Sequence, residues 1–162
     1  MKPRYVLFAG VACVFLSVLG LLWLALAPTN FQSDAGGGVT ASAALQREHA
    51  ATTGKPDAKV HIVEFLDPAC ETCREFYPMV KRMLAENPDK IRLSVRLVAF
   101  HKGSDFVVKA LEASKAQGKF WPVLERLLAS QSRWAVQHTV RPELVWEQLQ
   151  SLGLNLDQLK AD

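Results

Sequence analysis

The sequence predicts an α/β domain that is preceded by a long apolar segment and a linker. Two apolar, β-branched runs at residues 60–66 and 91–98 flank a helical pattern, which is typical of a βαβ unit. The rest of the chain to residue 162 shows helical periodicity. Near the start of the chain, residues 5–27 contain no charged side chain.

The composition fits one folded domain with accessory segments. Of the 162 residues, 49% are hydrophobic and 22% are charged, which excludes a disordered or collagen-like chain. The formal net charge is +3, and Lys2 and Arg4 carry two of the positive charges ahead of the apolar run. The remainder is close to neutral, so it has no basic surface for nucleic acid, and we expect no nucleic-acid partner.

Residues 1–27 are predicted to be an N-terminal transmembrane anchor or signal segment. At about 1.5 Å per residue, a helix over residues 5–27 would cross a hydrocarbon core of about 30 Å. Lys2 and Arg4 precede this run, and the next basic residue is Arg47. This asymmetry predicts a single-pass protein of the inner membrane, with its domain on the periplasmic or extracellular side.

A cleaved signal is the alternative, and it would give a periplasmic or secreted protein. Ala25-Leu26-Ala27 has the small residues of a cleavage site, but Pro28 follows directly and the apolar run is long for a signal. Cys13 lies inside the run, where we expect it to be a small apolar residue of a membrane helix.

Residues 28–58 are predicted to be a flexible linker, and residues 59–162 the folded domain. The linker is rich in Ala, Gly, Ser, Thr and Pro, and Gly36-Gly37-Gly38 would destabilise any helix.

The domain is expected to begin with a buried strand over residues 60–66, which Asp67-Pro68 ends. A helix follows from about Cys70 and stops at Asn87-Pro88-Asp89. Its apolar positions recur at helical spacing: Phe76, Val80, Met83 and Leu84. The second strand, residues 91–98, should run parallel to the first.

Several helices are predicted after the second strand. Ser104 is expected to cap the first of them, and Gly118 to end it. Another helix covers about residues 120–130. Pro142 suits the first turn of a third helix, and Asn155 would cap a final short one.

The motif Cys70-Glu71-Thr72-Cys73 is the main chemical signal in the sequence. It is expected where the first strand gives way to the first helix, with Cys70 at the helix N-terminus and Cys73 one turn inside. Unpaired N–H groups and the helix dipole favour a thiolate there. A spacing of three residues puts both sulfurs on one face, as thiol–disulfide exchange requires.

Three other interpretations of the cysteine pair compete with exchange chemistry. A structural disulfide would close a very small loop and constrain little. A zinc site needs four ligands, but there is no second CxxC, and the histidines lack metal-ligand spacing. A lone CxxC can also occur by chance. We expect no metal site and no cofactor.

Three motifs occur in order along the chain: Val63-Glu64-Phe65-x-Asp67-x-x-Cys70-x-x-Cys73, then His101-x-Gly103-Ser104, then Gln117-Gly118-Lys119-Phe120-Trp121. Together they resemble the DsbA-like thiol:disulfide oxidoreductases of the thioredoxin superfamily, from about Gly54 to the end. The resemblance implies a thioredoxin-like fold with a helical insertion after the second strand. It implies oxidation, reduction or isomerisation of disulfides in exported proteins. The implied partners are protein thiol or disulfide substrates and a membrane or soluble redox partner.

The resemblance also implies residue roles. Cys70 would be the attacking sulfur, and Cys73 would resolve the mixed disulfide. Glu64 would be an acid beneath Cys73 that handles its proton, unless it points to solvent from an edge strand. Glu71 and Thr72 would tune the redox potential, toward a less oxidising couple than relatives that carry a histidine before the second cysteine. His101 would have a loop or packing role.

The family's fold normally continues into a hairpin that starts with a cis-proline and then into a last helix. No proline of this sequence qualifies, so the fold is expected to be incomplete at its C-terminus, with an open edge along residues 60–66. Either the chain is truncated, which we favour and which would impair substrate docking first, or something else covers that edge. The alternative function is a non-catalytic, membrane-anchored thioredoxin-like module, such as a metal binder that uses both cysteines or an inactive truncated domain.

Overall fold

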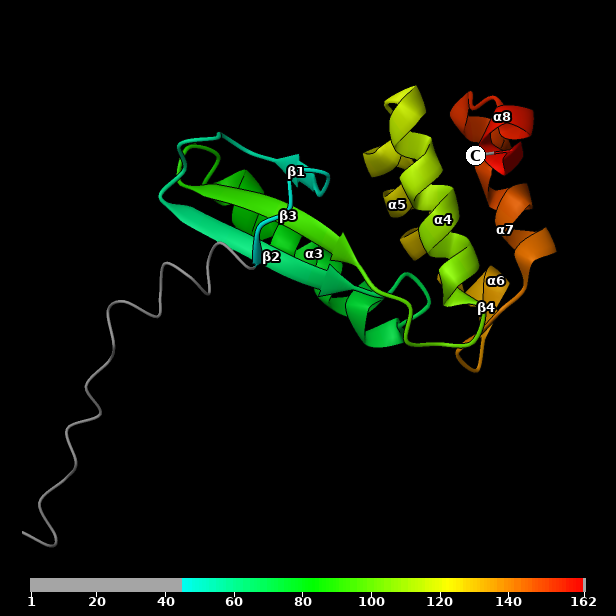
Figure 1. Cartoon of the computed structure of the whole chain (residues 1–162). Coiled ribbons are helices and arrows are strands. Elements are labelled where there is room, and N and C mark those ends of the chain that lie inside the picture. Colours follow the sequence, from blue (N-terminus) through cyan, green and yellow to red (C-terminus); the bar gives the residue numbers. More distant parts are fainter. Residues whose placement is uncertain (1–44, 162) are drawn as a thin grey trace, which may run out of the picture. The chain divides into compact units, whose positions relative to one another are not determined.

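The computed structural model describes residues 45–161 (Figure 1). The predicted anchor or signal segment, residues 1–27, lies outside the described residues, as do residues 28–44 of the predicted linker. Within residues 45–161, no helix has both the length and the apolar character needed to cross a membrane.

A three-stranded sheet lies on one side of the first long helix. Its strands are β1 (Ala51–Thr53), β2 (Val60–Leu66) and β3 (Ile91–Leu97), in the order β1-β3-β2. The central strand β3 is antiparallel to β1 and parallel to β2, with Val60 paired to Ile91. The parallel pair confirms the predicted βαβ unit.

The strand β1 lies inside the range 28–58 that was expected to be a linker, so the fold begins before residue 59. The sequence gives little sign of it because a strand of three residues, Ala51–Thr53, carries no alternation. Gly54 follows with a φ of +95°, and a side chain there would meet the Ile91 carbonyl oxygen at 2.6 Å from its Cβ. The close approach explains why this position needs glycine.

The strand β2 is less buried than its apolar sequence predicted. Val60 is 49% exposed and Phe65 is 47% exposed, and Leu66 alone in the strand is fully buried. The reason is that β2 pairs with β3 only, among the strands that the structure describes. The expected open edge along residues 60–66 is therefore present in this part of the chain.

The helix α3 (Glu71–Glu86) connects β2 to β3 and ends at Asn87, as predicted. Its packed face differs from the expected one, because Phe76 and Met83 are exposed by 54% and 39%. The side chains that pack against the core are Cys73, Tyr77, Val80 and Leu84. The helix carries two apolar stripes, and periodicity alone does not tell which one faces the sheet.

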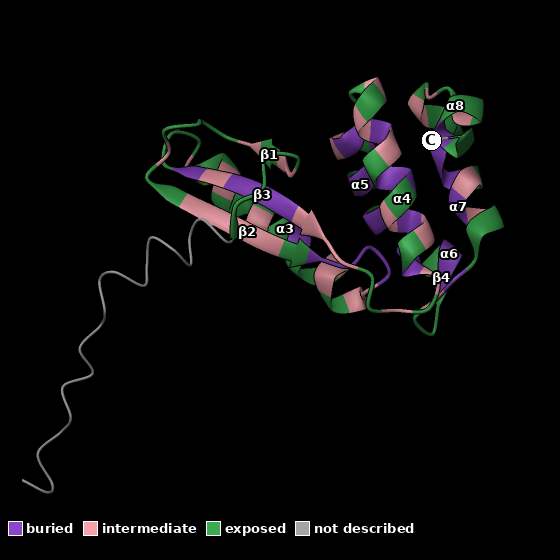
Figure 2. Cartoon of the chain, viewed as in Figure 1, coloured by how far each residue is buried: buried purple, intermediate pink, exposed green. Residues whose placement is uncertain are grey.

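The remainder of the chain is mainly helical, as predicted, and it forms a second part of the core (Figure 2). Its α-helices are α4 (Ser104–Ser114), α5 (Phe120–Ala129), α6 (Gln131–Trp134), α7 (Pro142–Leu149) and α8 (Leu156–Ala161). Short 3-10 turns, η1 (Lys115–Gln117) and η2 (Gln150–Leu152), follow α4 and α7. The indole of Trp134 is fully buried and donates a hydrogen bond of 3.0 Å to the carbonyl oxygen of Leu127.

The predicted helix ends are mostly confirmed. Pro142 occupies the first turn of α7, and the Asn155 side chain accepts a hydrogen bond of 3.0 Å from the N–H of Gln158 at the start of α8. The expected cap at Ser104 is wrong. Gly103 holds the cap position of α4, with a φ of +80°, and the Ser104 side chain points inward instead.

A small hairpin that the sequence did not predict lies between α6 and α7. Its strands are β4 (Ala135–Val136) and β5 (Thr139–Val140). Gln137 and His138 form the turn with φ values of 48° and 59°, a conformation that usually takes glycine or asparagine. The N–H of Val140 donates to the Lys102 carbonyl oxygen at 3.0 Å, which ties the hairpin to the loop before α4 (Figure 1).

Candidate dithiol site

The two cysteines of the CxxC motif lie at the N-terminus of α3, as predicted. Cys70 is the N-cap residue, in extended conformation, and Cys73 lies within the first turn. Both are free thiols, both are half-buried, and they hydrogen-bond to each other. The unpaired N–H groups of the helix start therefore lie where a Cys70 thiolate would form.

The surroundings of Cys73 favour its protonated form. Burial is the largest cause, and together with the neighbouring Cys70 thiol it raises the pKa of Cys73 to about 11. The backbone N–H of Asp67 opposes this shift in part by donating a hydrogen bond to the sulfur. The raised pKa keeps Cys73 protonated at neutral pH, and its side chain packs against the hydrophobic core.

The carboxylate of Asp67 anchors the loop between β2 and α3. It is 1% exposed and accepts hydrogen bonds from the N–H of Ala69 (2.8 Å), the N–H of Phe100 (2.7 Å), and the N–H and Nδ1 of His101 (3.0 and 2.8 Å). The Ser104 hydroxyl donates another. Burial alone would raise the pKa of Asp67, but the hydrogen bonds outweigh it and lower the pKa. The sequence offered Asp67 only as part of a motif.

The side chain of Glu64 points into the domain. Glu64 is half-buried, and its Oε2 is buried without a hydrogen-bond partner among the described residues. Burial raises the pKa of this carboxyl. The pKa of Tyr77, one turn after Cys73 on α3, is raised by burial and then by the charges of Glu125 and Glu64. The burial of Oε2 favours the inward position over the solvent-facing alternative.

The two residues between the cysteines differ in their surroundings. Thr72 is exposed. Glu71 has one carboxylate oxygen, Oε2, that is shielded from water. It lies 2.6 Å from Nδ1 of His138, within ion-pair distance but without hydrogen-bond geometry. The sequence placed Glu71 beside Cys70, but it gave no sign that the hairpin turn would reach this carboxylate.

Two histidines from different segments stack beside the dithiol. The rings of His101 and His138 are 4.8 Å apart between centroids, with 19° between their planes. His101 lies in the loop before α4 and is fixed by Asp67, whereas His138 comes from the β4–β5 turn and contacts Glu71. The expected loop role of His101 therefore includes a contact network that ends at the CxxC motif.

Gln131 also contacts the cysteine loop, and sequence reasoning missed it. Its side chain is 2% exposed, and Nε2 donates hydrogen bonds to the carbonyl oxygens of Pro68 (2.7 Å) and Cys70 (2.9 Å). It connects α6 to the segment just before α3. A single glutamine in a helical stretch carries no signal of this kind.

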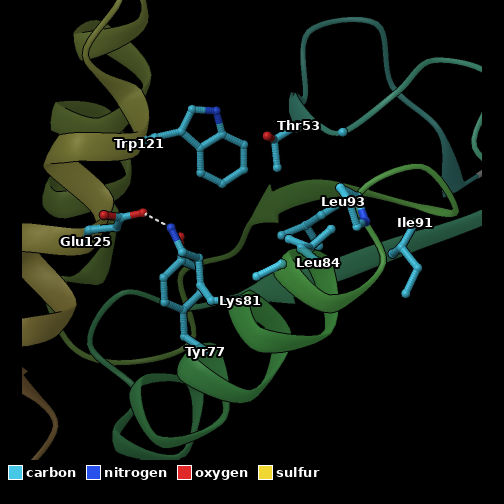
Figure 3. Close-up of a pocket in the computed structure, with 11 residues that line it drawn as sticks. Thr53, Tyr77, Lys81, Leu84, Ile91, Leu93, Trp121 and Glu125 are labelled. Carbon is cyan, nitrogen blue, oxygen red and sulfur yellow. Dashed lines mark hydrogen bonds and ion pairs between the residues drawn. The ribbon is translucent and has the colours of Figure 1, made fainter.

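A cavity of about 460 Å³ lies between α3, β3 and α5 (Figure 3). Its walls include Leu84, Leu93 and Trp121, and the ion pair between Lys81 Nζ and Glu125 Oε1, at 2.5 Å, crosses its side. No cysteine lines this cavity. Across residues 45–161, no three or more side chains of His, Cys, Asp or Glu are grouped so as to hold a metal ion.

Comparison with known proteins agrees with the fold. A sequence model of the thioredoxin family, described as Thioredoxin, matches residues 46–160. The chain belongs to this thioredoxin family, and its structural neighbours are DsbA-like. The fold is similar to that of α-DsbA1 from Wolbachia pipientis, with a TM-score of 0.61 at 15% identity over 74% of this chain and 61% of that chain.

Two solved structures have more similar sequences. A thioredoxin-like oxidoreductase from Silicibacter pomeroyi DSS-3 is 26% identical, with a TM-score of 0.61 over 72% of this chain and 64% of that chain. Oxidised BdbD from Bacillus subtilis is 29% identical, with a TM-score of 0.59 over 70% of this chain and 64% of that one.

A curated relative is much longer than this chain. The Na(+)/H(+) antiporter NhaA of Herminiimonas arsenicoxydans is 28% identical over 109 residues, which is 67% of this chain and 17% of the relative. The chain therefore spans about a sixth of the length of this curated relative.

Proposed function

We propose that this protein is a thiol–disulfide oxidoreductase that acts on the cysteines of exported proteins. The observation that carries the proposal is the unequal setting of the two thiols. Cys70 caps α3 among unpaired N–H groups, while burial raises the pKa of Cys73 to about 11. One sulfur is set to attack, and the other is kept protonated until it is needed.

In the reducing direction, the Cys70 thiolate attacks one sulfur of a client disulfide. The client S–S bond breaks, a mixed disulfide forms, and one client thiolate leaves. The Cys73 thiol loses its proton and attacks the Cys70 sulfur, which releases the second client thiolate and leaves a Cys70–Cys73 disulfide. The client gains two electrons and the protein loses two. In the oxidising direction, every step runs in reverse.

Glu64 is proposed to accept the Cys73 proton during resolution and to return it in the reverse direction. An internal carboxyl whose pKa is raised by burial is closer to neutral pH than an exposed one, as proton transfer requires. The support for this role is the buried Oε2 of Glu64, which has no hydrogen-bond partner among the described residues.

Glu71 and Thr72 are proposed to tune the redox potential. A carboxylate next to Cys70 disfavours its thiolate, and an exposed threonine offers only a neutral hydroxyl. We expect a couple less oxidising than that of relatives with a histidine before the second cysteine. The clients would be protein thiols and disulfides, and a separate redox partner would restore the dithiol or the disulfide.

The proposed location is the outer face of the inner membrane. Residues 1–27 would be the anchor, or a cleaved signal, and the residues that follow them would tether the domain. The support is the uncharged run at residues 5–27 with basic residues on one side only.

The test is exchange with a disulfide-containing peptide by the full chain and two variants. Cys70→Ser should abolish exchange, and Cys73→Ala should accumulate mixed disulfides through Cys70, because resolution is lost. Cys13→Ser is the matched control and should exchange at the normal rate. Normal turnover by either Cys70→Ser or Cys73→Ala would refute the proposed function.

A further inference from the structure

The β4–β5 turn contacts the CxxC motif from outside α3. Gln137 and His138 both have positive φ values, 48° and 59°, although neither is glycine. Such a conformation costs free energy in most residues and persists where surrounding contacts hold it. The main contacts of His138 are the Glu71 carboxylate at 2.6 Å and the stacked ring of His101.

His101, the other member of this stack, is held in place by a hydrogen bond. Nδ1 of His101 donates to Oδ2 of Asp67 at 2.8 Å, and Asp67 is buried and held by the loop around it. The hairpin is fixed in addition through the Val140 N–H, which donates to the Lys102 carbonyl oxygen. The fold therefore holds the imidazole of His138 against Glu71, the residue that directly follows Cys70.

We propose that His138 is a positioning residue of the dithiol, which holds the Glu71 side chain and, when protonated, offsets its negative charge beside Cys70. This proposal rests on the proposed function and adds to it the residue that adjusts the thiolate. The CxxC motif itself has Thr72 before the second cysteine, so the imidazole near this dithiol is supplied from a different element of the fold.

Several charged groups act together at this position. Glu71, at the start of α3, contacts the His138 side chain. The ring of His101, in the loop before α4, stacks on the ring of His138 and is hydrogen-bonded to Asp67. Lys102 lies in the same loop, and its backbone pairs with Thr139. Histidine side chains as a class change charge near neutral pH, so a comparison at two pH values tests for an imidazole contribution.

The expected effect is modest because the pair is partly open to water. The side chains of His138 and Glu71 are 58% and 36% exposed. Ion pairs at such positions change an equilibrium by about two- to fivefold. The effect should be larger at pH 5.5 than at pH 8.5, because histidine side chains as a class carry more positive charge in acid.

The test measures the rate of Cys70 alkylation by iodoacetamide in the reduced full chain, with labelling at Cys70 read by peptide mass spectrometry. His138→Asn retains a residue that tolerates positive φ and replaces the ring by an uncharged amide. At pH 5.5, wild-type Cys70 should react about two- to fivefold faster than Cys70 in His138→Asn. At pH 8.5, the two rates should converge. His138→Gly, which also accepts the turn conformation, should behave in the same way.

The matched control is His61→Gln, because His61 hydrogen-bonds to Ser94 on the sheet and has no contact with Glu71. It should leave the Cys70 rate unchanged at both pH values. Glu71→Gln removes the carboxylate that contacts the imidazole. In this background, His138→Asn should change the rate of Cys70 alkylation at pH 5.5 very little.

An effect of His138→Asn that is equal at both pH values would indicate a structural role and overturn the proposal. No effect at pH 5.5, or an undiminished effect in Glu71→Gln, would also overturn it. Failure of the proposed function is a separate outcome. In that case Cys70 would react no faster than in the denatured protein, whatever residue occupies position 138.

Discussion

The buried side-chain amide of Gln131 donates a hydrogen bond of 2.9 Å to the carbonyl oxygen of Cys70. The same nitrogen donates to Pro68 at 2.7 Å. The position of Cys70, the proposed attacking cysteine, is thus set by a residue of the helical part that lies about sixty positions later in the chain.

Gln131→Leu should destabilise the fold and slow exchange. It leaves the carbonyl oxygens of Pro68 and Cys70 without this donor, which costs about 1–3 kcal/mol when such groups are buried. Chemical unfolding measures the first effect, and single-turnover exchange with a disulfide peptide measures the second.

Gln148→Leu is the control for Gln131→Leu. Gln148 is also buried, but its amide donates to Leu144 within α7, at 3.3 Å. The Gln148→Leu variant should be less stable than wild type, but its folded form should exchange disulfides at the wild-type rate. Equal exchange rates in the two variants would contradict a role for Gln131 in placing Cys70.

Asp67→Asn should remove a pH-dependent contribution to the free energy of unfolding. The folded-state pKa of Asp67 is lowered, so its contribution is complete above the unfolded value of about 4 and is lost as the pH falls through the folded value. At pH 7 the variant should be less stable by about 3 kcal/mol, because an amide presents donors to the donors of Ala69 and Phe100.

Urea unfolding at pH 7 and at pH 3 checks the Asp67 prediction. The difference between wild type and variant should narrow in acid. Asp105→Asn serves as the control, because Asp105 is exposed and lies 4.0 Å from Lys109. A gap between wild type and Asp67→Asn that is the same at both pH values would show that the ionised carboxylate is not the source of stability.

Glu64→Gln should make the protein more stable and less active. Burial raises the folded-state pKa of Glu64, so its cost is absent below the unfolded value of about 4 and grows as the pH rises through the folded value. The variant should therefore gain stability over wild type at pH 8 and little at pH 4. Exchange should slow about tenfold or more, because proton transfer at Cys73 is impaired.

The comparison for Glu64 is Glu75→Gln, because the Glu75 side chain is 69% exposed on α3. Glu75→Gln should change neither stability nor exchange by a large amount. A Glu64→Gln protein that resolves mixed disulfides at the wild-type rate would exclude the proton-transfer role.

The βαβ unit and the position of the dithiol could be predicted from the sequence because each rests on local pattern. The run at residues 60–66 is strand-like, and Cys70 follows the turn that Asp67-Pro68 makes. The helices after residue 104 were also predictable, since their apolar positions recur at helical spacing. Such patterns require no knowledge of contacts between distant residues.

The remaining parts of the site depend on contacts that no local pattern encodes. The β4–β5 hairpin has strands of two residues and a turn without glycine, so it carries neither alternation nor a turn signal. Ser104 was interpreted as a helix cap because serine often is one, but its hydroxyl is used by Asp67. Gln131 and His138 reach the dithiol only after the helical part has packed.

The unpaired side of β2 has a practical consequence for the purified protein. Alternate residues of β2 direct their N–H and C=O groups to this side, where no strand pairs with them among the described residues, and Val60 and Phe65 keep apolar surface exposed. An extended peptide from any source could add a strand there without side-chain complementarity. Concentrated samples should therefore be prone to self-association and aggregation, and conditions that limit strand addition should be chosen before exchange rates are measured.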